Sequence, residues 1–497
     1  MQKYNLDKQH ANGKMHAIER IRYLLDADSF SEIGSNVSNM IRGNEDNRKF
    51  PYDGVITGYG AIEGQKVFIY AQDVTINGGT LGLNHGKKIS HLIELAIKQK
   101  CPLIGINDSG GARIQEGVNS LAGYGEIFYY NTLASGFIPQ ISIIAGTCAG
   151  GAVYTPGITD FVFVIENISQ MFVTGPKVVK SVIGQECTME ELGGASIHAY
   201  RSGVAHFYHH NERACFDEVR KLVVLLADTT QRSYLSNNSY PYIEKAGCTG
   251  FKIPESSRKV YDIKNVIKEI LDENSFIEVQ KDFAKNLVVG YGKLCNITVG
   301  IVASQPSCLG GVLDCDSSDK GARFVRFCDA FEIPLITLVD VPGFMPGIEQ
   351  EQNGIIRHGA KLLYAYAEAS TIKLTLILRK AYGGAYIAMC SKHLRADFVY
   401  ALSNAEIAVM GAEGAVPIIY NSKIKELDEA GRELFIKEME EKYKTEFLNI
   451  YDALAAGYVD EIVELSEVRE RFYKDIFILS NKRELITLNK KHGCIPL

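Results

Sequence analysis

The feature that most constrains the fold of this 497-residue chain is an internal duplication. A buried strand, a polar glycine turn and a second strand ending in Gly-Gly-Ala occur together twice, as CPLIGINDSGGARIQEG with CAGGAVY and as IPLITLVDVPGFMPG with AYGGAYI. Asp108 and Asp340 end equivalent strands at a spacing of 340 − 108 = 232, and the GYG triplets that begin at Gly58 and Gly290 share this spacing. Matches held in one register indicate two copies of one fold.

The pattern within each copy predicts an α/β fold. Strands such as PLIGIND and PQISIIAGT are near-continuous apolar runs, which is typical of strands buried on both faces of a sheet, and segments with helical spacing separate them. From about residue 232 to 257 the sequence is rich in turn-forming residues and has no clear period, so it is the best linker candidate. We therefore predict two domains, residues 1–240 and 241–497.

Charge and composition exclude several classes of protein. A net charge of −6 and a pI near 6.1 argue against nucleic acid as a partner, because a phosphate backbone requires a basic surface. The chain has no run of about 20 apolar residues, and its start is too polar for a secretory signal, so we expect a cytoplasmic protein without membrane insertion. The cysteines form no CxxC pair and no Cys/His cluster with zinc spacing, so no metal is predicted.

The two Gly-Gly-Ala turns are the strongest candidates for chemistry. A glycine turn at a helix start directs backbone N–H groups into one small volume, where they stabilise negative charge that develops on a carbonyl oxygen. One such turn is more often a structural helix start, whereas two at equivalent places suggest two carbonyl groups polarised in one reaction. GxSxG, Walker A and HExxH motifs are absent. Ser109 is expected to serve the turn, and Glu116, the nearby carboxylate, is expected to be a helix residue.

Several long segments together resemble biotin-dependent acyl-CoA carboxyltransferases, the family of the propionyl-CoA carboxylase β subunit and the methylmalonyl-CoA decarboxylase α subunit. The most specific are INDSGGARIQEG, GTCAGGAVY, SSDKGARFVRFCDAF, LVDVPGFMPG and RKAYGGAYIAM. The resemblance implies two tandem crotonase-like (ClpP/crotonase) ββα superhelical domains, with the acyl-CoA on the N-terminal side and biotin on the C-terminal side. It also implies a homohexamer built as a trimer of dimers.

The resemblance further implies a mechanism. The carboxyl group passes from carboxybiotin to the α-carbon of a short acyl-CoA, with propionyl-CoA ranked first, through a thioester enolate. By motif position, Gly150 and Gly151 would donate N–H groups to the thioester oxygen, and Gly384 and Ala385 to the ureido oxygen of biotin. Ile387 would line the pocket for the acyl chain. Further candidates by position are Ala149 and Tyr154 for the substrate pocket, and Gly110, Gly111, Arg113 and Lys177 for CoA.

Partners and alternatives follow from what the chain lacks. It carries neither a biotin-attachment tetrapeptide nor an ATP-binding motif, so a biotin carboxylase and a biotin carboxyl carrier protein are expected as separate subunits. The reverse reaction, in a methylmalonyl-CoA decarboxylase, remains an alternative, as does a biotin-independent hydrolase or isomerase on the same scaffold. A non-catalytic scaffold subunit would not need both glycine turns. Leu402 and Ser403 stand where relatives usually carry Trp-Pro, which concerns the biotin side.

Overall fold

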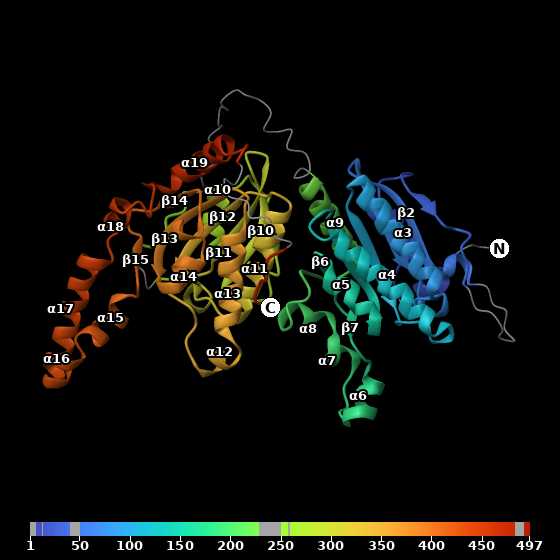
Figure 1. Ribbon diagram of the computed structural model, residues 1–497, viewed down its shortest axis with the longest axis horizontal. Coiled ribbons are helices and arrows are strands. Elements are labelled where there is room, and N and C mark those ends of the chain that lie inside the picture. Colours follow the sequence, from blue (N-terminus) through green and yellow to red (C-terminus); the bar gives the residue numbers. More distant parts are fainter. Residues whose placement is uncertain (1–5, 12, 40–49, 228–249, 257–258, 483–491) are drawn as a thin grey trace. The chain divides into compact units, whose positions relative to one another are not determined.

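The computed structural model describes residues 6–11, 13–39, 50–227, 250–256, 259–482 and 492–497 (Figure 1). The chain divides into two compact units, Met1–Thr230 and Gln231–Leu497, and each is described here by itself. The predicted domain boundary between residues 240 and 241, and most of the predicted linker, lie outside the described residues.

The first unit is built on an eight-stranded sheet of order β1-β2-β3-β4-β5-β6-β8, with β7 paired to β5. The β1-β2-β3 part is antiparallel, and the remaining pairs are parallel. The strands are β1 (Ser31–Ile33), β2 (Val55–Ile62), β3 (Gln65–Gln72), β4 (Leu103–Ser109), β5 (Gln140–Ala149), β6 (Phe161–Ile165), β7 (Gln170–Phe172) and β8 (Phe207–His209). The helices are α1 (Leu6–His10), α2 (Ala17–Leu24), α3 (Leu83–Gln99), α4 (Val118–Ala134), α5 (Tyr154–Ile158), α6 (Pro176–Ile183), α7 (Met189–Gly193), α8 (Ala195–Tyr200) and α9 (Glu212–Ala227).

The second unit repeats this plan with the order β16-β14-β13-β12-β11-β10-β9 and β15 paired to β13. The strands are β9 (Ile277–Val279), β10 (Leu287–Leu294), β11 (Ile297–Ser304), β12 (Leu335–Val341), β13 (Lys373–Tyr382), β14 (Phe398–Ala401), β15 (Glu406–Ala408) and β16 (Glu461–Ile462). The helices are α10 (Lys264–Ile270), α11 (Cys315–Ala330), α12 (Ile348–Gln352), α13 (Ile355–Glu368), α14 (Gly383–Ala388), α15 (Ala412–Ile419), α16 (Asn421–Glu426), α17 (Glu429–Phe447), α18 (Ile450–Ala455) and α19 (Leu465–Ile478).

The duplication extends to the pairing register of the strands. Strands β2 and β3 pair Val55 with Gln72, and β10 and β11 pair Leu287 with Ser304, so both partners are displaced by 287 − 55 = 304 − 72 = 232 residues. The parallel ladder that follows shifts register at the same point in both units, after residues 107 and 339. The predicted α/β class and the tandem duplicated fold are confirmed.

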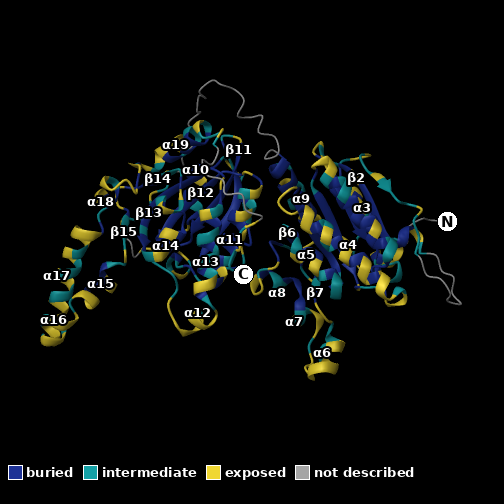
Figure 2. Ribbon diagram, viewed as in Figure 1, coloured by how far each residue is buried: buried dark blue, intermediate teal, exposed yellow. Residues whose placement is uncertain are grey.

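Both faces of each sheet are covered. In the second unit, α10 and α19 share one core cluster with side chains of β11 to β14, while α11 contacts β10 and β11 and packs against α13. In the first unit, α3 and α4 share a core cluster with β3 to β6, and α2 and α9 contact β3 as well as each other. Figure 2 shows the central strands of each sheet as almost continuously buried, whereas the short strands β1, β15 and β16 have no buried residue. The near-continuous apolar runs in the sequence have this origin.

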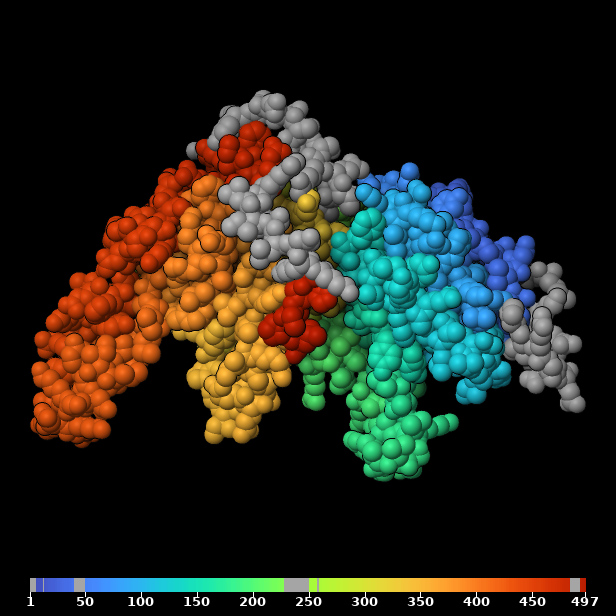
Figure 3. Space-filling view, in the orientation of Figure 1, coloured from blue at the N-terminus to red at the C-terminus, as the bar shows by residue number. Residues whose placement is uncertain are grey.

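The charged segment near the C-terminus forms helices that contribute little to the core. No residue of α16 or α17 is buried, and these helices lie at the surface in Figure 3. Within the described part of the chain, no helix is both long enough and apolar enough to span a membrane.

Two glycines set the distance between α3 and α4. A Cβ atom added at Gly86 of α3 would lie 2.6 Å from the Cα of Gly123 in α4, which is closer than two carbons can approach. The neighbouring atoms belong to the backbone, so no side-chain rotation can relieve the overlap. By contrast, a Cβ at Gly125 of α4 would meet nothing within 4 Å.

Replacing Gly86 with Ala should therefore lower the free energy of unfolding by about 1–3 kcal/mol, because it overpacks a contact between two backbones. The control Gly125→Ala adds the same methyl group to a helix in open space and should be neutral or stabilising by up to about 1 kcal/mol. Urea denaturation of the full chain measures both. Equal stability of the two variants would contradict the packing described here.

Candidate active site

The first glycine turn begins where β5 ends. Gly150 and Gly151 open a short 3-10 helix, η4 (Gly150–Val153), that leads into α5. Gly150 has φ +62°, a left-handed conformation that favours glycine, and a Cβ there would meet only one atom, a carbonyl oxygen 4.0 Å away. The end of β5 is held on two sides, because Cys148 pairs with Ser109 of β4 and with Met171 of β7.

The second glycine turn has the same backbone conformation. Gly383, with φ +58°, corresponds to Gly150 at a spacing of 383 − 150 = 233, and it opens α14 at the end of β13. The end of β13 is likewise held between Val341 of β12 and Ile407 of β15. The first N–H groups of a helix have no partner within the helix, so each turn presents backbone donors at a strand end.

An aromatic ring lies next to each turn, and the sequence had not singled out either ring. In the first unit, the ring of Tyr124 would be 3.0 Å from a Cβ at Gly151. In the second unit, the ring of Phe344 would be 3.8 Å from a Cβ at Gly384 and 3.0 Å from one at Gly359 of α13. The first turn is therefore more tightly backed than the second. A signal was present only in LVDVPGFMPG, where Phe344 follows a glycine next to the strand end.

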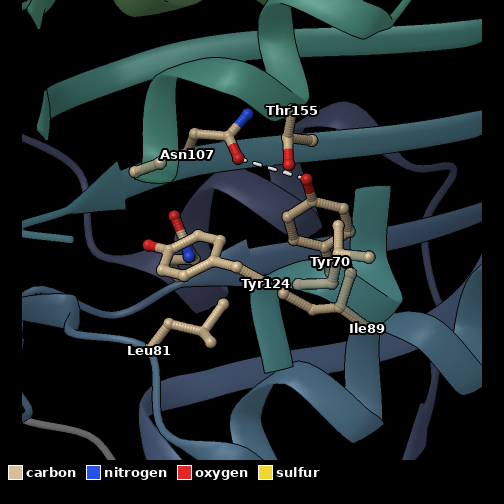
Figure 4. Close-up of a pocket in the computed structure, with 9 residues that line it drawn as sticks. Tyr70, Leu81, Ile89, Asn107, Tyr124 and Thr155 are labelled. Atoms are coloured by element: carbon tan, nitrogen blue, oxygen red, sulfur yellow. Dashed lines mark hydrogen bonds between the residues drawn. The ribbon is translucent and has the colours of Figure 1, made fainter. Parts of the chain in front are cut away.

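A small, mainly polar cavity lies behind the first turn (Figure 4). Its lining includes Tyr124 and Ala152, and the hydroxyl of Tyr70 donates to Oδ1 of Asn107 at 3.1 Å across it. Burial raises the pKa of both tyrosines well above the usual range, so their hydroxyls stay neutral. The cavity contributes neutral hydroxyl and amide groups behind the glycine turn.

The loop after β4 packs directly against the first turn. Gly111 has φ +97°, and a Cβ at this position would lie 2.8 Å from the carbonyl oxygen of Ala149. Its N–H donates to Oγ of Ser109 at 3.2 Å, and the N–H of Gly110 donates to the carbonyl oxygen of Gly78. Ser109 is completely buried, so its hydroxyl shapes the turn as predicted. The structure thus brings Gly110, Gly111 and Ala149 together at one strand end.

Arg113, a candidate for contact with CoA, has a different role in the structure. Its side chain is completely buried, and Nη1 lies 2.6 Å from carboxylate oxygens of both Asp53 and Glu116. Nη2 donates to the carbonyl oxygen of Thr80 at 2.8 Å. A buried guanidinium neutralised by two carboxylates is not available to a phosphate, so this expectation is corrected: Arg113 fixes the loop. Burial raises the pKa of Asp53, while the Arg113 charge opposes that rise.

The remaining candidates differ in exposure. Tyr154 is 50% exposed, with its ring edge-on to Phe128, and Ile387 is 38% exposed on α14. Lys177 is exposed on α6, and Gly384 is exposed as well, whereas Ala385 is completely buried. Gly384 is therefore the member of the second predicted pair that solvent reaches.

Two side chains near the first turn that could act as an acid or a base, Glu116 and His85, already have hydrogen-bond partners. The carboxylate of Glu116 accepts from Arg113 and from the N–H of Leu83 at 2.8 Å, in a 3-10 helix, η3 (Ile114–Glu116). His85 is completely buried with Nδ1 2.9 Å from the carbonyl oxygen of Asp53, and burial lowers its pKa well below the usual range. Both groups are thereby tied to the network of Asp53 and Arg113 that holds the loop.

A duplicated α/β fold with a left-handed glycine turn at the equivalent strand end of each unit defines a tandem crotonase-like protein. A family model described as the carboxyl transferase domain matches residues 8–495. The chain therefore belongs to the carboxyl transferase family.

Individual relatives agree with this assignment. The chain is 50% identical, over 98% of its length and 95% of the relative's, to a propionyl-CoA carboxylase carboxyltransferase subunit of Haloferax mediterranei. It is 46% identical, over 99% of its length and 95% of the relative's, to a methylmalonyl-CoA decarboxylase subunit alpha of Propionigenium modestum. The solved structure of the transcarboxylase 12S hexamer with hydrolysed methylmalonyl-CoA matches with a TM-score of 0.92 and 43% identity, covering 99% of this chain and 95% of that one.

The buried arginine and the exposed lysine should respond differently to substitution. Arg113→Met leaves two buried carboxylates without a counter-charge and should lower the free energy of unfolding by about 3–5 kcal/mol. Lys177→Met changes a surface residue and should stay within about 0.5 kcal/mol of the parent. Urea denaturation compares them. An Arg113→Met protein of parental stability would contradict the structural role assigned to this arginine.

Proposed function

We propose that this chain is the carboxyltransferase component of a biotin-dependent acyl-CoA carboxylase, with propionyl-CoA as its acceptor and methylmalonyl-CoA as its product. The observation that carries the proposal is the pair of glycine turns with one backbone conformation, at equivalent strand ends, in a chain of the carboxyl transferase family. Two equivalent turns suit a reaction in which two carbonyl oxygens gain negative charge, one on the thioester and one on the ureido ring.

The first turn is proposed to bind the thioester. The N–H groups of Gly150 and Gly151 would donate to its oxygen as the enolate forms, and the open space beside Gly150 admits a close approach. Donors of this kind act more strongly on the developing oxyanion than on the ground-state carbonyl, which is the requirement for catalysis. Tyr124 backs Gly151 and keeps the turn from moving away from the substrate.

The second turn is proposed to bind the ureido group of biotin. Gly384 is exposed, and the atom nearest to a Cβ built there is a ring carbon of Phe344 at 3.8 Å, so the surface leaves room for a planar ring. Ala385 is completely buried, so the hydrogen bond that its N–H is predicted to donate to biotin remains a prediction. When bound, carboxybiotin supplies the carboxyl group and, after its loss, the base for the α-proton. Glu116 is paired with Arg113 and His85 is buried, which fits a reaction in which no side chain removes the α-proton.

The acyl and CoA ends of the substrate are proposed to contact separate elements. Gly110, Gly111 and exposed Lys177 are the candidates for CoA, while Ala149, Tyr154 and the apolar Ile387 are the candidates for the acyl pocket. An apolar pocket distinguishes one methylene by about 1–3 kcal/mol. Propionyl-CoA is ranked first because relatives of similar overall identity are named for propionyl-CoA and methylmalonyl-CoA.

The opposite direction of transfer is the second candidate. The relative from Propionigenium modestum bears the name of a decarboxylase subunit, and its identity to this chain is close to that of the carboxylase relatives. Direction is set by the partner that charges or discharges biotin. Purification of the native complex separates the two: a biotin carboxylase that uses ATP supports carboxylation, and a membrane-bound decarboxylase partner supports the reverse.

Assembly and location belong to the same proposal. We infer a homohexamer, a trimer of dimers, because the similar transcarboxylase 12S core is described as a hexamer. The biotin carboxylase and the biotin carboxyl carrier protein are expected to be separate chains, and the assembly is expected to be cytoplasmic.

The half-reaction can be measured with purified protein, free biotin and a panel of malonyl-, methylmalonyl- and ethylmalonyl-CoA. Loss of the carboxyl group from the thioester should require biotin and be fastest with methylmalonyl-CoA. Neighbouring substrates should differ in kcat/KM by about 10- to 200-fold, as expected for a pocket that selects by one methylene. Turnover without biotin would instead support the hydrolase or isomerase alternative.

A bulky residue at the second turn should strongly slow transfer without unfolding the protein. Gly384→Val keeps the N–H group but places an isopropyl group where the ureido ring is proposed to bind, which holds the ring away from the donors. It should lower kcat/KM for biotin by about 100- to 1,000-fold, as much as the usual loss for one oxyanion donor. Gly157→Ala adds a methyl group in open space on α5 and serves as the control. Normal transfer by a folded Gly384→Val protein would overturn the assignment of the second site.

A further inference from the structure

Each sheet contains a completely or almost completely buried aspartate at the point where its ladder changes register. Asp108 lies on β4 between Asn107 and Ser109, and Asp340 lies on β12 between Val339 and Val341. The carbonyl oxygen of each one is the atom nearest to a Cβ built on a glycine of left-handed φ, Gly79 or Gly311. A side chain at either glycine would therefore clash with the backbone of the aspartate.

In the second unit, the counter-charge comes from the neighbouring strand. Nε of Arg379, on β13, donates to Oδ2 of Asp340 at 2.9 Å, and the hydroxyl of Tyr261 donates to the same oxygen at 3.1 Å. The guanidinium also stacks 4.8 Å from the ring centre of Tyr261. Oδ1 of Asp340 accepts from the backbone N–H of Lys380 at 3.3 Å, so the carboxylate holds the β13 backbone three residues before Gly383.

In the first unit, the counter-charge comes from a different part of the chain. The residue equivalent to Arg379 is Gly146, since 379 − 146 = 233, and a Cβ there would fall on the carboxylate of Asp108. Arg20 of α2 replaces it. Its Nη1 lies 3.4 Å from Oδ2 of Asp108, its Nη2 donates to the carbonyl oxygen of Ala145 at 2.9 Å, and its Nε lies 2.6 Å from Glu212 of α9. The contact with Ala145 holds the β5 backbone five residues before Gly150.

The two units thus provide a counter-charge for the equivalent buried aspartate from two different elements, α2 and β13. Both arginines are fully or almost fully buried, both neutralise the aspartate at the register shift, and both pairs hold the strand that leads into a glycine turn. A buried ion pair is a costly way to stabilise a core, because apolar residues often serve as well or better. Its presence in both copies, with the arginine drawn from two different elements, points to a role in placing the strand end.

We propose that Asp108 with Arg20 and Asp340 with Arg379 are positioning pairs, each of which aims the N–H groups of its own glycine turn. The inference rests on the proposed function, because it assigns the first pair to the thioester and the second pair to biotin. The pairs do not touch substrate. They act through the backbone between the register shift and the turn, where an error of 1 Å costs about 100-fold in rate.

The matched variants are Asp108→Asn, Asp340→Asn and the control Asp475→Asn. An asparagine at position 340 has nearly the shape of aspartate, but its NH2 group must face either the N–H of Lys380 or the donors of Arg379 and Tyr261. One of these hydrogen bonds is then lost, which should loosen β13. Asp475, on α19, is another buried carboxylate; it accepts from the hydroxyl of Tyr400 on β14 at 2.7 Å, with no contact to either glycine turn among its hydrogen bonds.

The kinetic readout is biotin-dependent decarboxylation of methylmalonyl-CoA, with KM and kcat determined for each substrate. Asp340→Asn should raise KM for biotin or lower kcat by about 10- to 100-fold, with KM for the thioester changed less than twofold. Asp108→Asn should show the converse, and Asp475→Asn should keep both KM values. If Asp108→Asn and Asp340→Asn lower stability with unchanged kinetics, as a purely structural pair would, the proposal is overturned.

A second readout does not depend on activity. Hydrogen–deuterium exchange should become faster in residues 381–386 of Asp340→Asn and in residues 148–153 of Asp108→Asn, but in neither segment of Asp475→Asn. Unchanged exchange overturns the inference even where the parent shows no turnover, so its failure is distinct from failure of the proposed function. Tyr261→Phe removes one donor and keeps the ion pair. It should give a smaller effect in the same direction, and it provides the test if Asp340→Asn does not fold.

Discussion

The structure depends on parallel strand pairs whose regular register is interrupted near the end of the strands. Strands β4 and β5, and again β12 and β13, pair regularly until the shift at residues 107 and 339. Beyond the shift, the end of β5 pairs with both β4 and β7, and the end of β13 pairs with both β12 and β15. A strand held on both sides up to its last residue fixes where the next residue must turn. The left-handed glycine that follows turns the chain from strand into helix, and the first N–H groups of that helix have no partner within it.

The two turns share a backbone conformation but differ in what lies next to them. The ring of Tyr124 is pressed against Gly151, whereas Phe344 stands at ordinary contact distance from Gly384 and is shared with Gly359. A tightly backed turn suits a small, charged oxygen, and a more open one suits a flat ring that slides across its surface. The asymmetry is consistent with one unit serving the thioester and the other serving a substrate delivered by a carrier.

The sequence was sufficient for features that repeat, and insufficient for those that join distant residues. The register of the duplication and both glycine turns could be predicted because identical spacing and residue type mark them. The expectation that Arg113 contacts CoA rested on its position in a segment that resembles the family. Its neutralising partner Asp53 lies 60 residues earlier, with no motif to connect them. Arg20 escaped notice for the same reason, since Asp108 and Glu212 lie 88 and 192 residues away along the chain.

These separations also order the events of folding. The contact between Arg379 and Asp340 closes a segment of 39 residues between adjacent parallel strands, so it can form as soon as that βαβ crossover is assembled. The contact of Arg20 with Glu212 must wait for α9, the last helix of its unit. Synthesis proceeds from the N-terminus, so the first unit acquires Glu212, the last member of its buried charge network, only when most of that unit has been made. Until then, Asp108 has its arginine within reach but the arginine lacks the acid that holds it in place. The unit that leaves the ribosome first is therefore the one whose buried ion pair depends on a contact between residues far apart in the sequence.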